Sequence, residues 1–89
     1  MESWIVGTTV VVPSDAIEIP DLAFKKNHYI TRVMFQPNSM CRRIGERAFG
    51  GCDSLQTIDM PNSVTIINDR AFAFCKSLQT VNIPDSVTV

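Results

Sequence analysis

Residues 48–65 read AFGGCDSLQTIDMPNSVT, and the same pattern returns at residues 71–88 as AFAFCKSLQTVNIPDSVT. The two segments are offset by 23 residues throughout, with Ala-Phe, Cys, Ser-Leu-Gln-Thr, Pro and Ser-Val-Thr at equivalent places. Self-similarity at a fixed period is typical of repeat proteins, in which each repeat buries its apolar face against its neighbours. We therefore expect a stack of similar coils.

A more diverged copy begins at Ala23-Phe24 and continues with apolar residues at strand spacing. Proline recurs every 23 or 24 residues, at Pro13, Pro37, Pro61 and Pro84. These positions predict a single domain over residues 1–89. Its expected divisions are a partial coil at 1–13, coils at 14–37, 38–61 and 62–84, and a second partial coil at 85–89.

Within a coil, the spacing L-x-x-L-x-L ends in the alternation of a strand. In the best-preserved coil these residues are Leu55, Ile58 and Met60. Pro61 follows and lacks an N–H for a ladder hydrogen bond, so it predicts the end of the strand. Each coil should therefore add one strand to a parallel sheet.

The rest of the coil is expected to contain a second short extended piece and a single helical turn. Val64 with Ile66 or Ile67 predicts the extended piece on another side of the coil. A cap-type residue and an acid ahead of Ala-Phe, as in Asn68-Asp69, favour a helical turn. The predicted class is α/β, a short solenoid of about three and a half coils with a parallel sheet on one face and helical turns opposite.

The pattern I-G-x-x-A-F-x-x-C-x-S-L-x-x-I-x-x-P-x-S-V-T runs from Ile44 to Thr65 and returns, without its glycine, from Ile67. It resembles the BspA-like leucine-rich repeats, strictly in two coils and loosely in the earlier ones. The resemblance implies a leucine-rich-repeat solenoid with a binding role and no shared catalytic residue or cofactor. It also implies adhesion to host or matrix proteins by a secreted or cell-surface protein. Residues 1–12 lack the features of a secretory signal, so the sequence itself leaves localisation open.

The composition narrows the classes of partner. The formal net charge is -1, and the sequence pI is about 5.6. Because binding to a phosphate backbone requires clustered Lys and Arg, we expect no nucleic-acid partner. The basic pairs Lys25-Lys26 and Arg42-Arg43 are interpreted as ordinary solvated charges. No apolar run approaches the roughly 20 residues of a membrane helix, so membrane insertion is not expected. A protein partner of unknown identity is the remaining expectation.

Cysteine and histidine offer little support for an enzyme or a metal site. Cys52 and Cys75 occupy the same position in adjacent coils, and we expect both to be reduced core residues rather than a disulfide or a zinc site. Cys41 falls near the position of Val64 in the next coil and should also be buried. His28 has no fixed spacing to a nucleophile.

Two further sets of equivalent residues have structural explanations. Asp21, Glu46 and Asp69 are attributed to the first turn of short helices rather than to a metal site. Phe24, Phe49 and Phe72 are predicted to form an aromatic column in the core, because stacking demands an inward residue in every coil.

The strand residues that point away from the core form the candidate partner-binding face. Alternation assigns two rows to this face: Thr9, Arg32, Thr57 and Thr80 in one, and Val11, Met34, Asp59 and Asn82 in the other. Thr31, Gln56 and Gln79 lie beside them. These rows contain no aromatic residue, which disfavours carbohydrate binding, and Arg32 and Met34 interrupt an otherwise neutral polar pattern.

The two ends of the stack lead to an alternative function. Trp4, Ile5 and Val6 are candidates to cover the first end, but no equivalent cap is apparent beyond Val81 and Ile83. Because uncapped solenoid ends favour association, the alternative is a self-assembling fragment of a longer array, or a homodimer through its C-terminal end.

Overall fold

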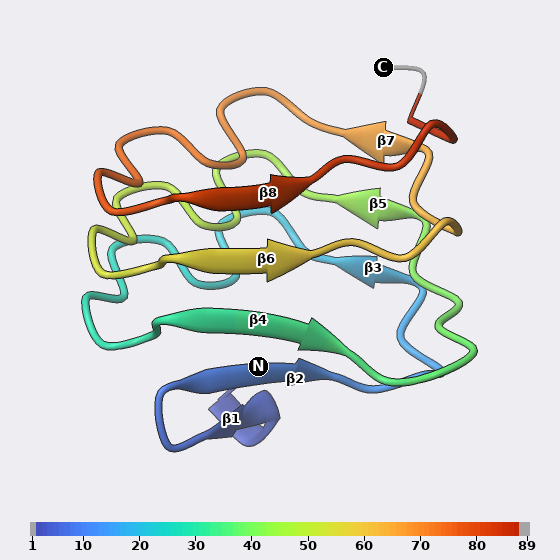
Figure 1. The fold of residues 1–89 in the computed structure, drawn as a ribbon, viewed down its shortest axis with the longest axis horizontal. Coiled ribbons are helices and arrows are strands. Elements are labelled where there is room, and N and C mark those ends of the chain that lie inside the picture. Colours follow the sequence, from blue (N-terminus) through green and yellow to red (C-terminus); the bar gives the residue numbers. More distant parts are fainter. Residues whose placement is uncertain (1, 88–89) are drawn as a thin grey trace.

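The computed structural model describes residues 2–87 as a short solenoid with two sheets (Figure 1). The predicted partial coil at 85–89 therefore lies partly outside the described residues. The elements are a 3-10 helix and eight strands: η1 (Glu2–Trp4), β1 (Ile5–Val6), β2 (Thr9–Val12), β3 (Glu18–Ile19), β4 (Arg32–Phe35), β5 (Arg43–Ile44), β6 (Thr57–Asp59), β7 (Ile66–Ile67) and β8 (Thr80–Asn82).

The larger sheet has the strand order β1-β2-β4-β6-β8, and β2 to β8 are parallel. It contains the strands predicted from the L-x-x-L-x-L spacing. The second sheet, β3-β5-β7, is formed by two-residue strands and lies behind the first in Figure 1. It includes Ile66–Ile67, the second extended piece predicted from the sequence.

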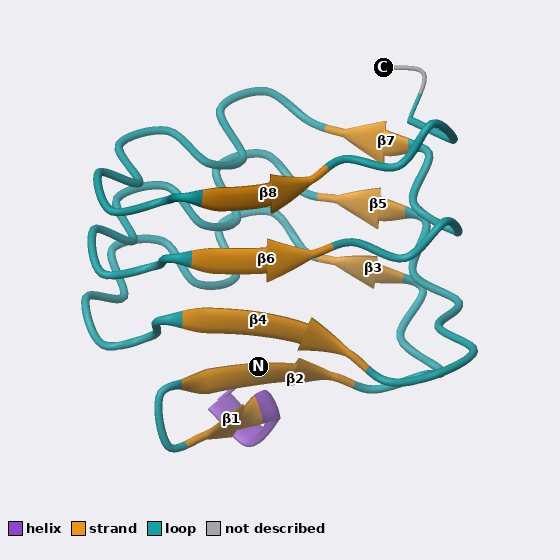
Figure 2. Cartoon of the chain, viewed as in Figure 1, coloured by secondary structure: helices purple, strands orange, loops and turns teal. Residues whose placement is uncertain are grey.

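The expected helical turns after the second sheet are replaced by successive tight turns, which appear as loops in Figure 2. Residues with positive φ recur at two equivalent places in every coil, and this conformation interrupts a right-handed helix. The first column is Leu22, Arg47 and Arg70, with φ of 64°, 52° and 56°. The second is Lys26, Gly51 and Phe74, with φ of 61°, 75° and 61°.

These turns also form a third ladder between coils. Alternate N–H groups of one coil donate to carbonyls of the next, while intervening groups close hydrogen bonds inside their own turn. Between the first two full coils, the donors are Leu22, Phe24 and Lys26, and the acceptors are Glu46, Ala48 and Gly50, at 3.0, 2.7 and 2.7 Å. The backbone is thus satisfied without helix or sheet.

The core lies between the three ladders and is entirely apolar. The Phe column is confirmed: Phe24 and Phe49 stack with ring centroids 5.4 Å apart, and Phe49 and Phe72 also at 5.4 Å. The rings are nearly parallel, at 9° and 1°, because each occupies the same place in its coil. Val10, Val33 and Ile58 line the inner side of the larger sheet and are fully buried.

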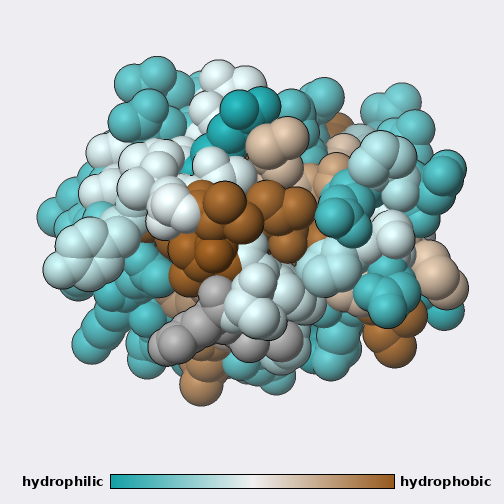
Figure 3. Space-filling model, turned by 90° about the horizontal axis from the view of Figure 1, so that it is seen from below, coloured by the Kyte–Doolittle hydropathy of each residue, from teal (hydrophilic) through white to brown (hydrophobic). Residues whose placement is uncertain are grey.

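The N-terminal end is covered by the segment expected to do so. Trp4 lies 6.3 Å from Phe24 between ring centroids, and β1 pairs antiparallel with the outer edge of β2. Trp4 and Ile5 pack against the core, whereas Val6 is exposed. Figure 3 views the stack from this end and shows apolar side chains gathered in the middle of the face.

Candidate functional site

The register of the larger sheet places the predicted face residues in rows. Thr9 pairs with Arg32, Arg32 with Thr57, and Thr57 with Thr80. In the second row, Val11 pairs with Met34 and Asp59 with Asn82. Strand spacing of about 4.8 Å sets the distance between successive side chains in a row.

Burial follows the predicted alternation along β2 and β4. On β2, Val10 and Val12 have no exposed surface. On β4, Val33 has none either, whereas its neighbours Arg32 and Met34 are exposed. Met34 retains 39% of its surface, which makes it an apolar contact on a mainly polar face. Because the inner face is buried, a single register is strongly favoured, and it fixes which residues of these rows point outward.

A side-chain hydrogen bond extends the face beyond the strands. Thr8 and Thr31 bring their Oγ1 atoms within 2.9 Å, and the N–H of Thr31 donates to the carbonyl oxygen of Thr8 at 2.8 Å. The N–H of Gln56 then donates to Thr31, and that of Gln79 to Gln56. The predicted neighbours of the face therefore continue its ladder at the strand entrances.

The cysteines form a hydrogen-bonded column, not a reactive one. Cys52 Sγ donates to the carbonyl oxygen of Phe24 at 3.1 Å, and Cys75 Sγ donates to that of Phe49 at 3.1 Å. All three cysteines are free thiols, with Cys41 and Cys52 buried and Cys75 half-buried. Burial raises the pKa of Cys52 to about 12 and raises the pKa of Cys75 as well. Since the thiolate is the nucleophile, these environments disfavour thiol chemistry.

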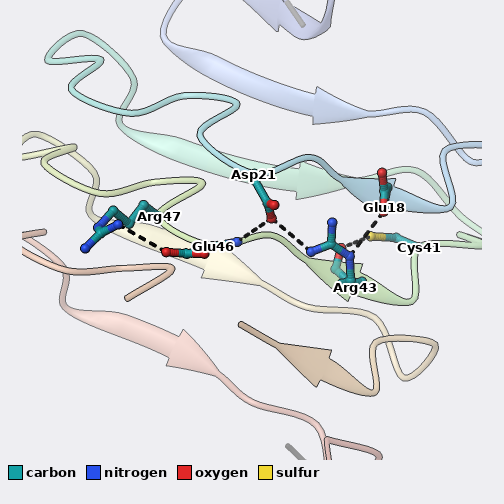
Figure 4. Close-up of polar contacts among 6 residues, drawn as sticks. All are labelled: Glu18, Asp21, Cys41, Arg43, Glu46 and Arg47. Atoms are coloured by element: carbon teal, nitrogen blue, oxygen red, sulfur yellow. Dashed lines mark hydrogen bonds and ion pairs between the residues drawn. The ribbon is translucent and has the colours of Figure 1, made fainter. Parts of the chain in front are cut away.

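The acidic residues do not occupy helix starts, which corrects the sequence interpretation. Asp21 Oδ1 instead accepts hydrogen bonds from Glu46 N at 2.7 Å and Arg43 Nη1 at 3.0 Å (Figure 4). Arg43 also donates through Nε to Glu18 at 3.1 Å. The hydrogen bond from Arg43, followed by that from Glu46, lowers the pKa of the Asp21 carboxyl. This network joins two coils behind the sheet face.

The same contact region explains Gly45. A Cβ at this position would meet Asp21 N, Asp21 Oδ1 at 2.6 Å and Pro20 C at 2.6 Å. The loop of the preceding coil thus approaches the backbone more closely than any side chain allows.

The structure gives His28 a partner that sequence spacing did not indicate. Its Nδ1 lies 2.9 Å from Asp53 Oδ1, and both side chains are largely exposed. Among residues 2–87, no cluster of three His, Cys, Asp or Glu side chains could hold a metal ion. The described helix is also far too short to cross a membrane.

Sequence reasoning missed a second surface, on the tight-turn side of the coils. A hollow of about 530 Å³ lies between Lys25, Lys26, Gly51, Arg70 and Phe74. Phe74 is 78% exposed, and Tyr29 is another exposed aromatic outside the predicted rows. The Lys25-Lys26 pair was the only signal in the sequence, because the other residues come from different coils.

Comparison with known proteins identifies repeats of one type across the chain. The family model described as a BspA type leucine rich repeat region (6 copies) matches residues 6–89. The comparison with curated proteins found no match.

Two solved structures resemble the chain closely. A leucine rich repeat protein from T. pallidum is 34% identical, with a TM-score of 0.83 over 91% of this chain and 39% of that one. A leucine rich cell surface protein from Faecalibacterium prausnitzii A2-165 is 40% identical, with a TM-score of 0.79 over 91% of this chain and 22% of that one. The chain thus spans less than half the length of either relative.

Proposed function

The chain belongs to the BspA-type leucine-rich repeat family, and from this premise we propose that it is a non-catalytic scaffold that binds a protein partner. The two in-register rows on β2, β4, β6 and β8 carry this proposal. Four parallel strands hold these side chains at a constant spacing above a close-packed core. A rigid face loses little conformational entropy on binding, which favours affinity.

The chemistry of the rows favours a polar protein surface with one apolar contact. Threonine, Asn82 and Asp59 provide hydrogen-bonding groups, and Arg32 and Met34 lie two residues apart on β4. Arginine and methionine are enriched in protein interfaces, and a pair at the centre of a patch can dominate its affinity. We place the main contact at this pair.

A cell-surface role is the finer part of the proposal. The relative from F. prausnitzii is described as a cell surface protein, and its repeats share 40% of their residues with this chain. We propose that this chain also acts outside the cell, as part of an adhesion-type protein. Its neutral polar face suits contact with other proteins better than contact with nucleic acid or anionic lipid.

Site-specific photo-crosslinking tests the binding face. A photoreactive residue is placed at position 34 on the face or, as the matched control, at position 40. Met40 is also exposed but lies at the corner beyond β4. We expect adducts with an extracellular partner from position 34 only, and their loss when Arg32→Ala is added. Equal labelling from both positions, or labelling from 40 alone, would reject the face.

Association through the C-terminal end is the second candidate. Within residues 2–87, no strand pairs with the outer edge of β8, and Ile83 is 57% exposed. The N–H groups of Arg70, Phe72 and Phe74, which continue the third ladder, also have no acceptor among these residues. A second surface with the shape of a coil could accept hydrogen bonds from these N–H groups and also cover Ile83.

A further inference from the structure

The hollow on the tight-turn side is lined in part by a double glycine. Gly50 and Gly51 line it together with Lys26 of the preceding coil and Phe74 of the next coil. A Cβ at Gly51 would already lie 3.3 Å from Lys26 Cγ. A second hollow shares Lys26, Gly51 and Phe74 with the first and is also lined by His28, Asp53 and Lys76. We call these residues, with Lys25 and Arg70, the Phe74 groove.

Phe74 contributes nothing to the core that would explain its presence. It is 78% exposed and adopts a φ of 61°, which is strained for a residue with a side chain. The equivalent residue of the preceding coil is Gly51, whose φ of 75° carries no such strain. Glycine at position 74 would therefore adopt the same backbone conformation with less strain. An exposed ring held at a strained position is available to contact a ligand.

The charge around this ring is unbalanced. Four cations around the ring form no ion pair in the part of the chain that the structure describes: Lys25, Lys26, Arg70 and Lys76. Two acids lie nearby: Glu46 forms an ion pair with Arg47, and Asp53, which lines the second hollow, lies 2.9 Å from His28 Nδ1. The chemical complement of the groove is thus an apolar group flanked by carboxylates.

We propose that the Phe74 groove binds an acidic peptide segment of a partner protein, with one apolar side chain against Phe74 and carboxylates at Lys26 and Arg70. The groove crosses three coils, or about 10 Å at the usual strand spacing, which is the length of about three extended residues. A segment with acids on both sides of a central apolar residue matches this arrangement. The site is separate from the sheet face and adds a second contact to the proposed scaffold.

The first measurement is an NMR titration of the ¹⁵N-labelled chain with an acetylated and amidated peptide, Glu-Asp-Leu-Asp-Glu. We expect saturable shifts at the amides of Gly51, Ala73 and Phe74, with a midpoint on the order of 1 mM. The affinity should fall severalfold between about 50 and about 200 mM salt because exposed charges are screened. Two further ligands are the neutral peptide Gln-Asn-Leu-Asn-Gln and inorganic phosphate. If either shifts the same amides with the same midpoint, or if the acidic peptide shifts none of them, the proposal is wrong.

Two variants separate recognition from folding. Phe74→Gly removes the ring and relieves the strained φ, so the melting temperature should stay equal or rise while binding weakens about tenfold. Lys26→Gln should weaken binding about threefold, whereas Arg42→Gln, an exposed arginine outside the groove, should leave it unchanged. Native affinity in Phe74→Gly, or equal losses in the Lys26 and Arg42 variants, would overturn the assignment. Binding of the sheet-face partner should persist in Phe74→Gly, which makes failure of the two proposals distinguishable.

Discussion

Cys52 donates a hydrogen bond from its Sγ atom to the carbonyl oxygen of Phe24, one coil earlier, across 3.1 Å. The same contact joins Cys75 to Phe49 at the same distance. The repeated cysteine therefore donates a hydrogen bond to a backbone carbonyl of the Phe column. This contact lies where the tight turn leads back toward the sheet. This role explains why the residue recurs at fixed spacing without forming a disulfide.

Alkaline pH should destabilise the fold through Cys52. Burial raises its pKa from 9.0 to about 12, so the unfolded chain releases this proton before the folded one does. The contribution of the neutral thiol to the free energy of unfolding is fully present below about pH 9. It is lost as the pH rises toward about 12, and the loss is at most about 1.4 kcal/mol for each pH unit. Serine keeps the hydrogen-bond donor but does not titrate in this range. Denaturant unfolding of the Cys52→Ser variant should therefore show a smaller alkaline loss than the native chain, and identical losses would contradict this account.

Substitution of Gly45 should disrupt the contact between the first two full coils. In Gly45→Ala the new Cβ would collide with the backbone of Pro20 and Asp21, which cannot move without breaking the ladder of tight turns. We expect a loss of about 3 kcal/mol in the free energy of unfolding, at the upper end for overpacking. Gly50→Ala is the matched control, because its nearest contacts of 3.4 Å are ordinary and its φ is not positive. A similar stability for the two variants would show that the close approach is unimportant.

The regular strands were predictable, and the turns were not, for a physical reason. Buried positions in β4 and β6 alternate with exposed ones, so Val33 and Ile58 signal the strands through hydrophobicity alone. The tight turns depend on backbone φ, which the residue types do not signal. In the two columns of left-handed residues in these turns, only Gly51 is a glycine, whereas Lys26 and Phe74 hold the same conformation with side chains that normally avoid it. A cap-like residue followed by an acid therefore suggested helix where successive turns occur.

The candidate sites also include one part that was predictable from the sequence and one part that was not. The rows of the sheet face follow from strand period and repeat offset, so the sequence alone predicts the pairing of Thr57 with Thr80. The Phe74 groove required three-dimensional information, because Lys26, Gly51 and Phe74 are brought together only by stacking three coils. The bridge from Asp21 to Arg43 was equally hidden, since Ile66 holds the position equivalent to Arg43 in the next coil.

Acid should weaken the fold through Asp21. Hydrogen bonds from Arg43 and Glu46 hold the pKa of this carboxyl below its ordinary 3.8, so its stabilising effect is present at neutral pH and is lost as the pH falls through the lowered pKa. Asp21→Asn should be less stable than the native chain at pH 6, and the difference should shrink on acidification toward pH 2. Asp15→Asn, at an exposed carboxyl outside this network, should match the native chain throughout. A constant difference between Asp21→Asn and the native chain would show that the charge is not responsible.

A charge at the last strand should prevent association if the C-terminal end is a contact surface. Ile83 is 57% exposed beside β8, whose outer edge carries unpaired backbone groups in residues 2–87. Light scattering of the native chain should show a mass that rises with concentration toward that of a dimer, and Ile83→Lys should remain a monomer because burying an ammonium group is costly. Ile17→Lys introduces the same change at an exposed isoleucine near the other end and should associate as the native chain does. A native chain that stays monomeric at all concentrations would remove self-assembly as a function, whereas equal dissociation of both variants would point to net charge rather than to this end.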